Sequence, residues 1–397
     1  MYACFGLIAF SFAPLVPDIR ADLALSATTM GVVMGAWQLV YIGAAIPVGT
    51  LLDRLPSRWV LLLAATALAA SAFGRSLADS TLTLLLAVGL LGVGGPIVSA
   101  GAPKIIAQHF QGAQRGLAMG IYMTGPTLGG IVALVLSRST LLPLFDDDWR
   151  RIMTLWAAAS LGVGIIWFIL ASLSPTARRH PRSDPNIAST VEPTGQVLRE
   201  LLSSSTLRTI LLMAVAVFMF NHGLNNWLPQ ILTLRGIDAT TASSLAAAPM
   251  AVGIVASLTL PRFATPARRR RMLAGLAITA LLSTLLLLRG EELALGTGLI
   301  LQGIARSTLM TILILFLVEL PVVGDRRAGT ASGLFFACAE VGGATGPALL
   351  GWISDVTGSF LAGVYTLAAL AAAVALATTR LPPPQSASAI DANQKST

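Results

Sequence analysis

The sequence predicts an all-α membrane protein with twelve transmembrane helices, and three observations lead to that prediction. The 397-residue chain is 55% hydrophobic and only 11% charged, whereas soluble domains carry about 25% charged residues. Twelve apolar stretches approach the length that a helix needs to cross about 30 Å of hydrocarbon. The loops between them alternate between arginine-rich and acidic or mixed, which is typical of a chain that crosses a membrane repeatedly.

The apolar stretches fall into two groups of six. They cover residues 2–18, 28–49, 59–77, 82–110, 116–137 and 151–173, and then 207–232, 241–260, 272–288, 293–321, 328–352 and 360–379. We therefore expect an N-terminal six-helix bundle (1–173), a polar cytoplasmic linker (174–206), a C-terminal six-helix bundle (207–380) and a disordered tail (381–397). The first stretch is short and lacks a basic lead, which suggests a start at a downstream methionine.

Charge and repetition support this organisation. Arginines concentrate in alternate loops, as in the run Arg268–Arg271, and arginine-rich loops face the cytoplasm. With twelve crossings, both termini are then cytoplasmic. A shift of about 213 residues lays Gly129 and Gly130 onto Gly342 and Gly343, as expected of two pseudo-symmetric halves.

A charged turn between the second and third stretches reads Gly-Thr-Leu-Leu-Asp-Arg-Leu-Pro-Ser-Arg over residues 49–58. Its Gly-x-Leu-x-Asp-Arg-x-x-x-Arg spacing resembles the signature loop between helices 2 and 3 of the major facilitator superfamily, although Pro56 and Ser57 depart from the family pattern. The resemblance implies the major facilitator fold of two pseudo-symmetric six-helix bundles. It also implies a gating role for Asp53, Arg54 and Arg58. The alternative is a basic loop that merely obeys charge asymmetry.

The fifth stretch contains Gly125-Pro126-x-x-Gly129-Gly130, which resembles part of a motif of proton-coupled drug exporters. The resemblance favours antiport. Separately, segments rich in small residues bend and slide between the halves of transporters, so we expect a gating role for Gly125 and Pro126, and static helix packing is the alternative. Two short segments, 102–110 and 226–237, also resemble the cyanate permease-like branch of the superfamily.

Arg306 lies near the middle of the stretch 293–321, where an ionisable side chain is costly and therefore points to function. Its guanidinium predicts a site for an anionic group, with Gln302 one turn away on the same face. Glu340, near the middle of the stretch 328–352, is the expected proton-coupling residue. A structural ion pair between Arg306 and Glu340 is the alternative, and a pair that exchanges partners during transport would satisfy both interpretations.

Further polar groups gather in the stretch 207–232. At 100° per residue they cover about 140° of one helix face, which is too polar for lipid and predicts a substrate cavity. These residues are Asn221, His222, Asn225 and Asn226. His222 is a second candidate for proton coupling, with a simple hydrogen-bonding role as the alternative.

The first half offers milder candidates for substrate binding. Trp37, Gln38 and Tyr41 share one face of the second stretch, and Tyr122 lies in the fifth. Aromatic and amide groups of this kind can surround a small solute, whereas core or interfacial packing is the alternative for the aromatic pair. Arg75, at the outer end of the third stretch, is expected at the membrane interface.

These features predict a secondary active transporter for a small solute, an organic anion, that works by alternating access with proton coupling. We expect it to act as a monomer in the bilayer of the bacterial inner membrane. The rival prediction is a proton-coupled exporter of a cationic or neutral drug or metabolite, in which Glu340 would bind the substrate.

Other classes of protein fit less well. An enzyme would need a catalytic constellation, but the sequence has three histidines, no metal-ligand spacing and no phosphate loop, so we expect no metal and no cofactor. The net charge of +8 belongs to membrane topology rather than nucleic-acid binding. A receptor would usually bring a long soluble domain, and a channel is disfavoured by the two-half repeat.

Overall fold

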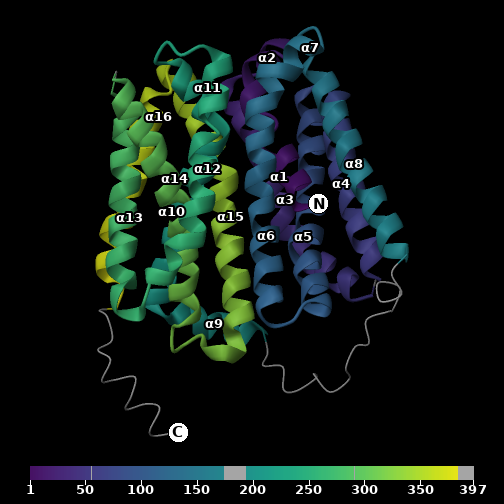
Figure 1. Cartoon of the computed structure of the whole chain (residues 1–397). Helices are drawn as coiled ribbons and strands as arrows, with labels where there is room; N and C mark the ends of the chain where they lie inside the picture. Colours follow the sequence, from purple (N-terminus) through teal and green to yellow (C-terminus); the bar gives the residue numbers. More distant parts are fainter. Residues whose placement is uncertain (55, 174–193, 290, 383–397) are drawn as a thin grey trace, which may run out of the picture. The chain divides into compact units, whose positions relative to one another are not determined.

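A computed structural model describes residues 1–54, 56–173, 194–289 and 291–382 of the chain. In these ranges the chain forms helices joined by short turns, with no β-strand (Figure 1). The elements are α1 (Tyr2–Phe10), η1 (Ala13–Leu15), α2 (Val16–Asp22), α3 (Ala27–Arg54), α4 (Ser57–Ser76), α5 (Thr81–His109), α6 (Gly112–Leu136), η2 (Ser137–Leu141), α7 (Leu142–Leu144), α8 (Trp149–Leu173), α9 (Thr194–Ser203), α10 (Ser205–Thr233), α11 (Ala239–Leu245), α12 (Ala248–Thr259), η4 (Pro261–Phe263), α13 (Pro266–Leu286), α14 (Glu292–Val318), α15 (Gly324–Thr357), α16 (Leu361–Ala377) and η5 (Thr378–Arg380).

Within the described ranges, eleven helical segments are long and apolar enough to cross a membrane. They correspond to eleven of the twelve predicted stretches. The remaining stretch, 272–288, lies in α13, which opens on the four arginines Arg268–Arg271 and so has a shorter apolar part. Every predicted stretch is therefore helical, although 2–18 and 241–260 are each divided into shorter helices, and the boundaries of the longest helices lie a few residues beyond those predicted.

The chain divides into two compact units. One unit takes its residues from Met1–Ile187, His222–Ala251 and Ala344–Phe360, and the other takes the rest. Three helices, α10, α12 and α15, contribute residues to both units.

Helices of the first unit pack closely where glycines remove side chains. Here α4 packs on α5 and α8, α3 on α5, and α1 on α6. A Cβ atom at Gly92 would collide with the backbone of Trp37, and one at Gly129 would collide with the carbonyl oxygen of Ala3. Small residues drive helix association in membranes because lipid provides no hydrophobic force between helices.

The first predicted span is a helix broken after α1. Pro14 and Pro17 lack an N–H group and cannot continue the backbone hydrogen-bond ladder. Side chains bond the carbonyl oxygens at the break instead: Arg75 Nη1 donates to Ile8 O at 2.7 Å, Gln230 Nε2 to Ala13 O at 2.9 Å and Arg138 Nη1 to Pro14 O at 2.9 Å. Because the membrane core offers no water to bond these carbonyl oxygens, the three side-chain donors stabilise the break in the helix.

Arg75 lies in the last turn of α4 and is buried among other helices, while its predicted position at the membrane interface stays a prediction. Its side chain is 1% exposed, with the guanidinium carbon 4.6 Å from the centre of the Phe12 ring. Its Nη1 also reaches Ser11 Oγ at 3.4 Å. Burial follows from its role as a hydrogen-bond donor at the break after α1, which no pattern within its own helix reveals.

In the second unit, α13 packs against α14 and α16. Arg269 in α13 is 6% exposed and forms an ion pair with Glu319, just after α14. The second part of the predicted linker folds as α9, whose Glu200 lies 2.8 Å from Arg327 at the start of α15. Residues 174–193 of the predicted linker and 383–397 of the predicted tail lie outside the described ranges.

The charged turn is shorter than the predicted loop 49–58. Helix α3 continues through Arg54, and α4 begins at Ser57 with Pro56 as its N-cap residue. The side chains of Asp53 and Arg54 lie outside what the structure describes, and Arg58 is half-buried in the first turn of α4. Their gating role stays a prediction.

Candidate functional site

Arg306 occupies a partly buried position on α14 within the second unit. Its Nε donates a hydrogen bond to Asn221 Oδ1 at 3.3 Å, and its Nη2 donates to the backbone oxygen of Asn221 at 3.0 Å. The structure thus brings together two of the residues predicted to bind substrate. A guanidinium fixed in this way inside a bundle is a strong attractor for a carboxylate.

Three further polar side chains of the second unit are buried without hydrogen-bond partners among the described residues. Both amide atoms of Gln302, the hydroxyl of Thr308 and Oε2 of Glu340 are in this condition. Gln302 and Thr308 are completely buried, and Glu340 is 8% exposed. Unsatisfied buried polar groups are rare and costly, so each of these atoms is a position at which a ligand or water could bind.

Glu340 takes part in no ion pair within the described part of the chain. In this conformation Glu340 therefore does not form the structural ion pair with Arg306 that was the alternative prediction. An unpaired carboxylate in a membrane helix is costly to keep charged, and taking up a proton removes that cost.

The substrate-binding candidates predicted on α3, in the first half of the sequence, contact His222 within the first unit. Gln38 is fully buried, and its Nε2 lies 3.1 Å from His222 Nδ1. Trp37 contacts the His222 ring edge-on at 5.9 Å between ring centres and contacts the Tyr41 ring at 6.2 Å. The predicted face of α3 and the polar face of α10 thus form one cluster, although 184 residues separate Gln38 from His222.

Two aromatic residues and one hydroxyl join this cluster without having been predicted. Phe5 packs edge-on against Trp37 at 5.4 Å, and the hydroxyl of Tyr41 lies 2.8 Å from Ser99 Oγ. Tyr2 stacks on Tyr122 at 4.5 Å. These neighbours are common residue types in apolar helices, so the sequence carries no signal that could have singled them out.

Other predicted residues make more ordinary contacts. Tyr122 donates its hydroxyl hydrogen to the carbonyl oxygen of Val98 at 3.2 Å. Asn226 is 4% exposed and donates to the backbone of His222 one turn earlier in α10 at 2.9 Å, whereas Asn225 is half-buried. Gly125 and Pro126 lie on α6 against α1, where a Cβ at Gly6 would collide with Pro126.

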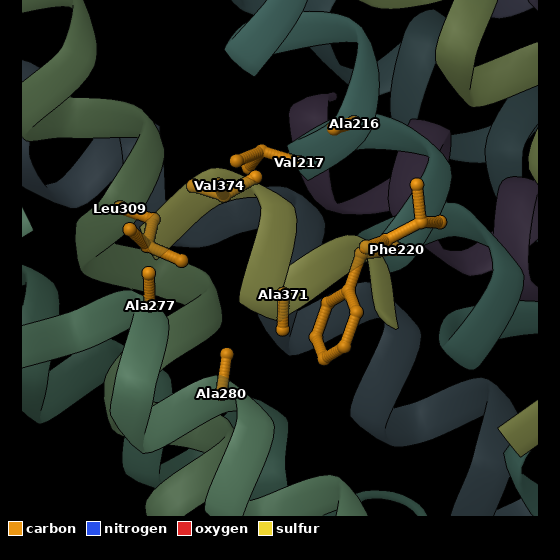
Figure 2. Close-up of a pocket in the computed structure, with 9 residues that line it drawn as sticks. Ala216, Val217, Phe220, Ala277, Ala280, Leu309, Ala371 and Val374 are labelled. Atoms are coloured by element: carbon orange, nitrogen blue, oxygen red, sulfur yellow. The ribbon is translucent and has the colours of Figure 1, made fainter. Parts of the chain in front are cut away.

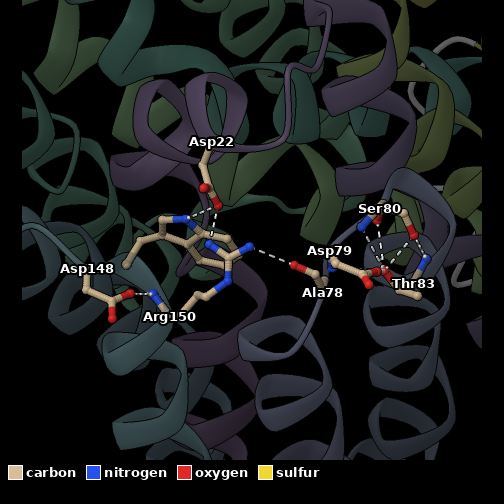
Figure 3. Close-up of polar contacts among 8 residues, drawn as sticks. Asp22, Ala78, Asp79, Ser80, Thr83, Asp148 and Arg150 are labelled. Carbon is tan, nitrogen blue, oxygen red and sulfur yellow. Dashed lines mark hydrogen bonds and ion pairs between the residues drawn. The ribbon is translucent and has the colours of Figure 1, made fainter.

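A polar cluster at the start of α8 belongs to the scaffold (Figure 3). Arg150 forms an ion pair with Asp22 and donates Nη2 to the carbonyl oxygen of Ala78 at 2.8 Å. The indole nitrogen of Trp149 donates to the same carboxylate of Asp22 at 3.1 Å. Asp79 and Thr83 bond at the start of α5 beside it. The cluster ties the ends of α2, α4 and α8 together.

A small cavity lies inside the second unit between α10, α13, α14 and α16 (Figure 2). All its lining residues are alanine, valine, leucine or phenylalanine, such as Phe220 and Leu309. With no hydrogen-bonding or charged side chain in its wall, it has no means of recognising an ion. We regard it as a packing defect and not as the substrate site.

A sequence model of the Major Facilitator Superfamily matches this chain over residues 1–321 and 236–396. The chain belongs to the major facilitator superfamily. This confirms the predicted fold class, a twelve-helix membrane protein of the major facilitator fold, and the prediction that the protein is a transporter and not an enzyme.

Curated relatives agree with this assignment. A hexuronate transporter of Bacillus subtilis (strain 168) is 24% identical over 366 residues, which cover 89% of this chain and 85% of the relative. A putative tartrate transporter of Agrobacterium vitis is 23% identical over 380 residues, covering 89% and 81%. The crystal structure of a mutant of the nucleoside transporter NupG aligns with a TM-score of 0.75 at 13% identity over 96% of this chain and 98% of that one. The superfamily member described here is thus an integral membrane protein that binds and moves a small molecule.

Proposed function

We propose that the protein is a secondary active transporter for a small organic anion, and that it works by alternating access coupled to protons. The observation that carries the proposal is the guanidinium of Arg306, held inside the bundle by Asn221. Relatives that cover most of the chain are named for hexuronate and tartrate, which are hydroxylated carboxylates. An arginine for the carboxylate and amides for the hydroxyls is the recognition chemistry that such solutes need.

The residues divide by role in this proposal. Arg306 binds the anionic group, with Asn221 and Gln302 beside it in the second unit. We assign contacts with the hydroxyl and apolar parts of the substrate to Gln38, Trp37 and Tyr41. Further substrate contacts come from Asn225, Asn226 and Tyr122. Glu340 carries the coupled proton, His222 assists it, and Asp53, Arg54, Arg58, Gly125 and Pro126 take part in gating.

The placement in the cell follows from the arginine-rich loops. We propose a bacterial inner-membrane protein with both termini in the cytoplasm that functions as a monomer. A second candidate is a proton-coupled exporter of a cationic or neutral compound. The unpaired carboxylate of Glu340 favours it, because a cation could bind there directly.

Ligand-induced stabilisation separates the two candidates. Purified protein is heated with glucuronate, tartrate, the hydrophobic cation tetraphenylphosphonium or glucose, because a ligand of the folded state raises the unfolding temperature by mass action. We expect stabilisation by the anions and its loss in Arg306→Ala, with an Arg268→Ala variant as control because Arg268 is exposed on α13. Stabilisation of wild type and Arg306→Ala alike by the cation would overturn the anion proposal.

A further inference from the structure

Arg75 of α4 bonds the end of α1, at the point where the first span breaks. Its Nη1 donates to Ile8 O at 2.7 Å and lies 3.4 Å from Ser11 Oγ, and its guanidinium carbon lies 4.6 Å from the centre of the Phe12 ring. Ile8 belongs to α1, Ser11 is its C-cap residue and Phe12 follows directly. Because the arginine side chain is 1% exposed, water does not compete for these contacts. Arg75 therefore fixes the end of α1 relative to α4.

The contact between α1 and α6 leaves the axial position of α1 to be set by other groups. A Cβ atom at Gly6 would collide with the carbonyl of Pro126, and one at Gly129 would collide with that of Ala3. The two backbones touch at these points, so no side chain interlocks there to determine how far α1 lies along its axis. Since α1 has nine residues, about 13 Å of helix, a hydrogen bond at Ile8 positions the whole of it.

Two aromatic residues of α1 pack against candidates for substrate binding. Phe5, one turn before Ile8, contacts Trp37 edge-on at 5.4 Å between ring centres. Tyr2, one turn earlier still, stacks on Tyr122 at 4.5 Å. Such ring contacts are favourable only over a narrow range of distances and orientations, so a shift of α1 by a single residue, about 1.5 Å, would disturb both. The axial position of α1 therefore determines how Trp37 and Tyr122 are supported.

We propose that Arg75 is a positioning residue of the substrate site. Its hydrogen bond to Ile8 sets the axial position of α1, and the aromatic rings of α1 then hold Trp37 and Tyr122 in place. The proposal rests on the proposed function, in which these two residues contact the substrate. The alternative is a purely structural arginine, whose loss would lower the stability of the protein without moving Trp37. All the residues involved belong to the first unit.

Fluorine NMR of Trp37 separates these two roles. The protein is labelled with fluorotryptophan, and the Trp37 signal is identified by its absence from Trp37→Phe. Arg75→Met keeps a side chain of similar length but removes the donor, while Ser11 Oγ still donates to Ile8 O at 2.9 Å. We expect the Trp37 signal to shift in Arg75→Met in the absence of substrate. Arg75→Lys, which keeps a donor for Ile8 O, should restore the wild-type signal.

The affinity for glucuronate provides the second measurement, taken from the rise in unfolding temperature with ligand concentration. It should fall about 2- to 10-fold in Arg75→Met, the range expected when one or two aromatic contacts are disturbed. Arg75→Lys should recover most of the loss. If Arg75→Met does not fold, Arg75→Gln takes its place, because the glutamine amide is too short to hold Ile8 O in the same position, and the same shift of the Trp37 signal is expected.

The matched control is Arg138→Met. Arg138 also donates to a carbonyl oxygen of the broken span, Pro14 O at 2.9 Å, and pairs with Asp18, but both partners follow the break and lie outside α1. Its loss should leave the Trp37 signal and the affinity unchanged, even where it lowers the unfolding temperature. An unchanged Trp37 signal in Arg75→Met, or an equal shift in Arg138→Met, would overturn the proposal. Because the signal is recorded without substrate, a shift confined to Arg75→Met supports the positioning of Trp37 even if no anion binds the wild type, in which case only the proposed function fails.

Discussion

Arg306 donates hydrogen bonds to both carbonyl oxygens of Asn221, one in the side chain and one in the backbone. The backbone oxygen lies inside α10, so the arginine attaches to the helix itself as well as to its side chain. The planar guanidinium is thereby fixed in orientation, and any movement of α10 at Asn221 acts on it directly. In the proposed transporter this relationship couples the anion-binding group to α10, the helix that carries four of the polar candidates.

Replacing Arg306 with lysine should weaken anion binding about tenfold or more while keeping the positive charge. A lysine ammonium cannot present the fixed fork that bonds Asn221 and a carboxylate together. Asn221→Ala should have a smaller effect, because the backbone oxygen remains as an acceptor. Titration of tartrate or glucuronate followed by the unfolding temperature measures both changes. Wild-type affinity in Arg306→Lys would show that charge alone suffices and that the fork geometry is irrelevant.

Glu340→Gln should separate binding from proton coupling. Glutamine has the shape of a protonated glutamate, so we expect anion binding and counterflow exchange to persist while uptake driven by a pH gradient is lost. Proteoliposomes with an imposed pH gradient provide the transport measurement.

Glu292→Gln is the control for that experiment, since Glu292 is an exposed residue in the first turn of α14. It should transport as wild type does. Gradient-driven uptake that survives in Glu340→Gln would exclude Glu340 as the proton carrier and leave His222 as the candidate.

Hydropathy was sufficient to locate the helices because burial in a membrane depends on composition over some twenty residues. It could not locate the breaks. Proline is common in membrane helices, and Pro126 lies within an unbroken α6 whereas Pro14 accompanies the break after α1. What decides the difference is whether distant donors such as Arg75 and Gln230 reach the carbonyl oxygens of the break. Such donors are contributed by other helices, so no local pattern reveals them.

In the candidate site, too, the sequence locates the residues but does not reveal their contacts with other helices. Arg306 and Arg75 are both arginines in apolar stretches, and the sequence separates them only by their distance from the end of the stretch. The structure gives Arg306 a polar partner in Asn221 and gives Arg75 a backbone carbonyl and the Phe12 ring. Periodicity did place Trp37, Gln38 and Tyr41 on one face. Their contact with His222 depends on how α3 and α10 pack, which helix periodicity alone does not determine.

Gly129→Ala should destabilise the protein by about 1–3 kcal/mol, the usual cost of forcing atoms into a packed interface. A Cβ there would collide with Ala3 O and lie 2.6 Å from the backbone nitrogen of Leu7, so α1 and α6 must move apart. Gly120→Ala is the matched control on the same helix, because nothing lies within 4 Å of its Cβ position. It should be neutral or stabilise by about 0.5–1 kcal/mol through helix propensity. Equal effects of the two substitutions on the unfolding temperature would contradict the packing argument.

The docking of helix α9 against α15 should weaken in acid, because it depends in part on the ion pair between Glu200 and Arg327. Gln196 donates to Glu200 Oε1 at 3.0 Å and Arg327 lies 2.8 Å from Oε2, and these two partners lower the pKa of Glu200 below its ordinary value of 4.5. A carboxyl whose pKa is lowered by folding stabilises the folded state above its ordinary pKa and loses that contribution as the pH falls through the lowered value. The docking of α9 should therefore be constant at neutral pH and weaken below about pH 4.5.

Hydrogen exchange of the α9 amides, corrected for the intrinsic pH dependence of exchange, measures that docking. The effect should be small, about twofold in protection, because exposed ion pairs are largely screened by water. Buried Val197 and Leu201 should keep the helix attached when the ion pair is lost. Glu200→Gln should show the weaker protection at every pH and no step in acid, since it has no proton to gain. An equal loss of protection in acid in Glu200→Gln would show that another group, and not Glu200, causes the acid sensitivity.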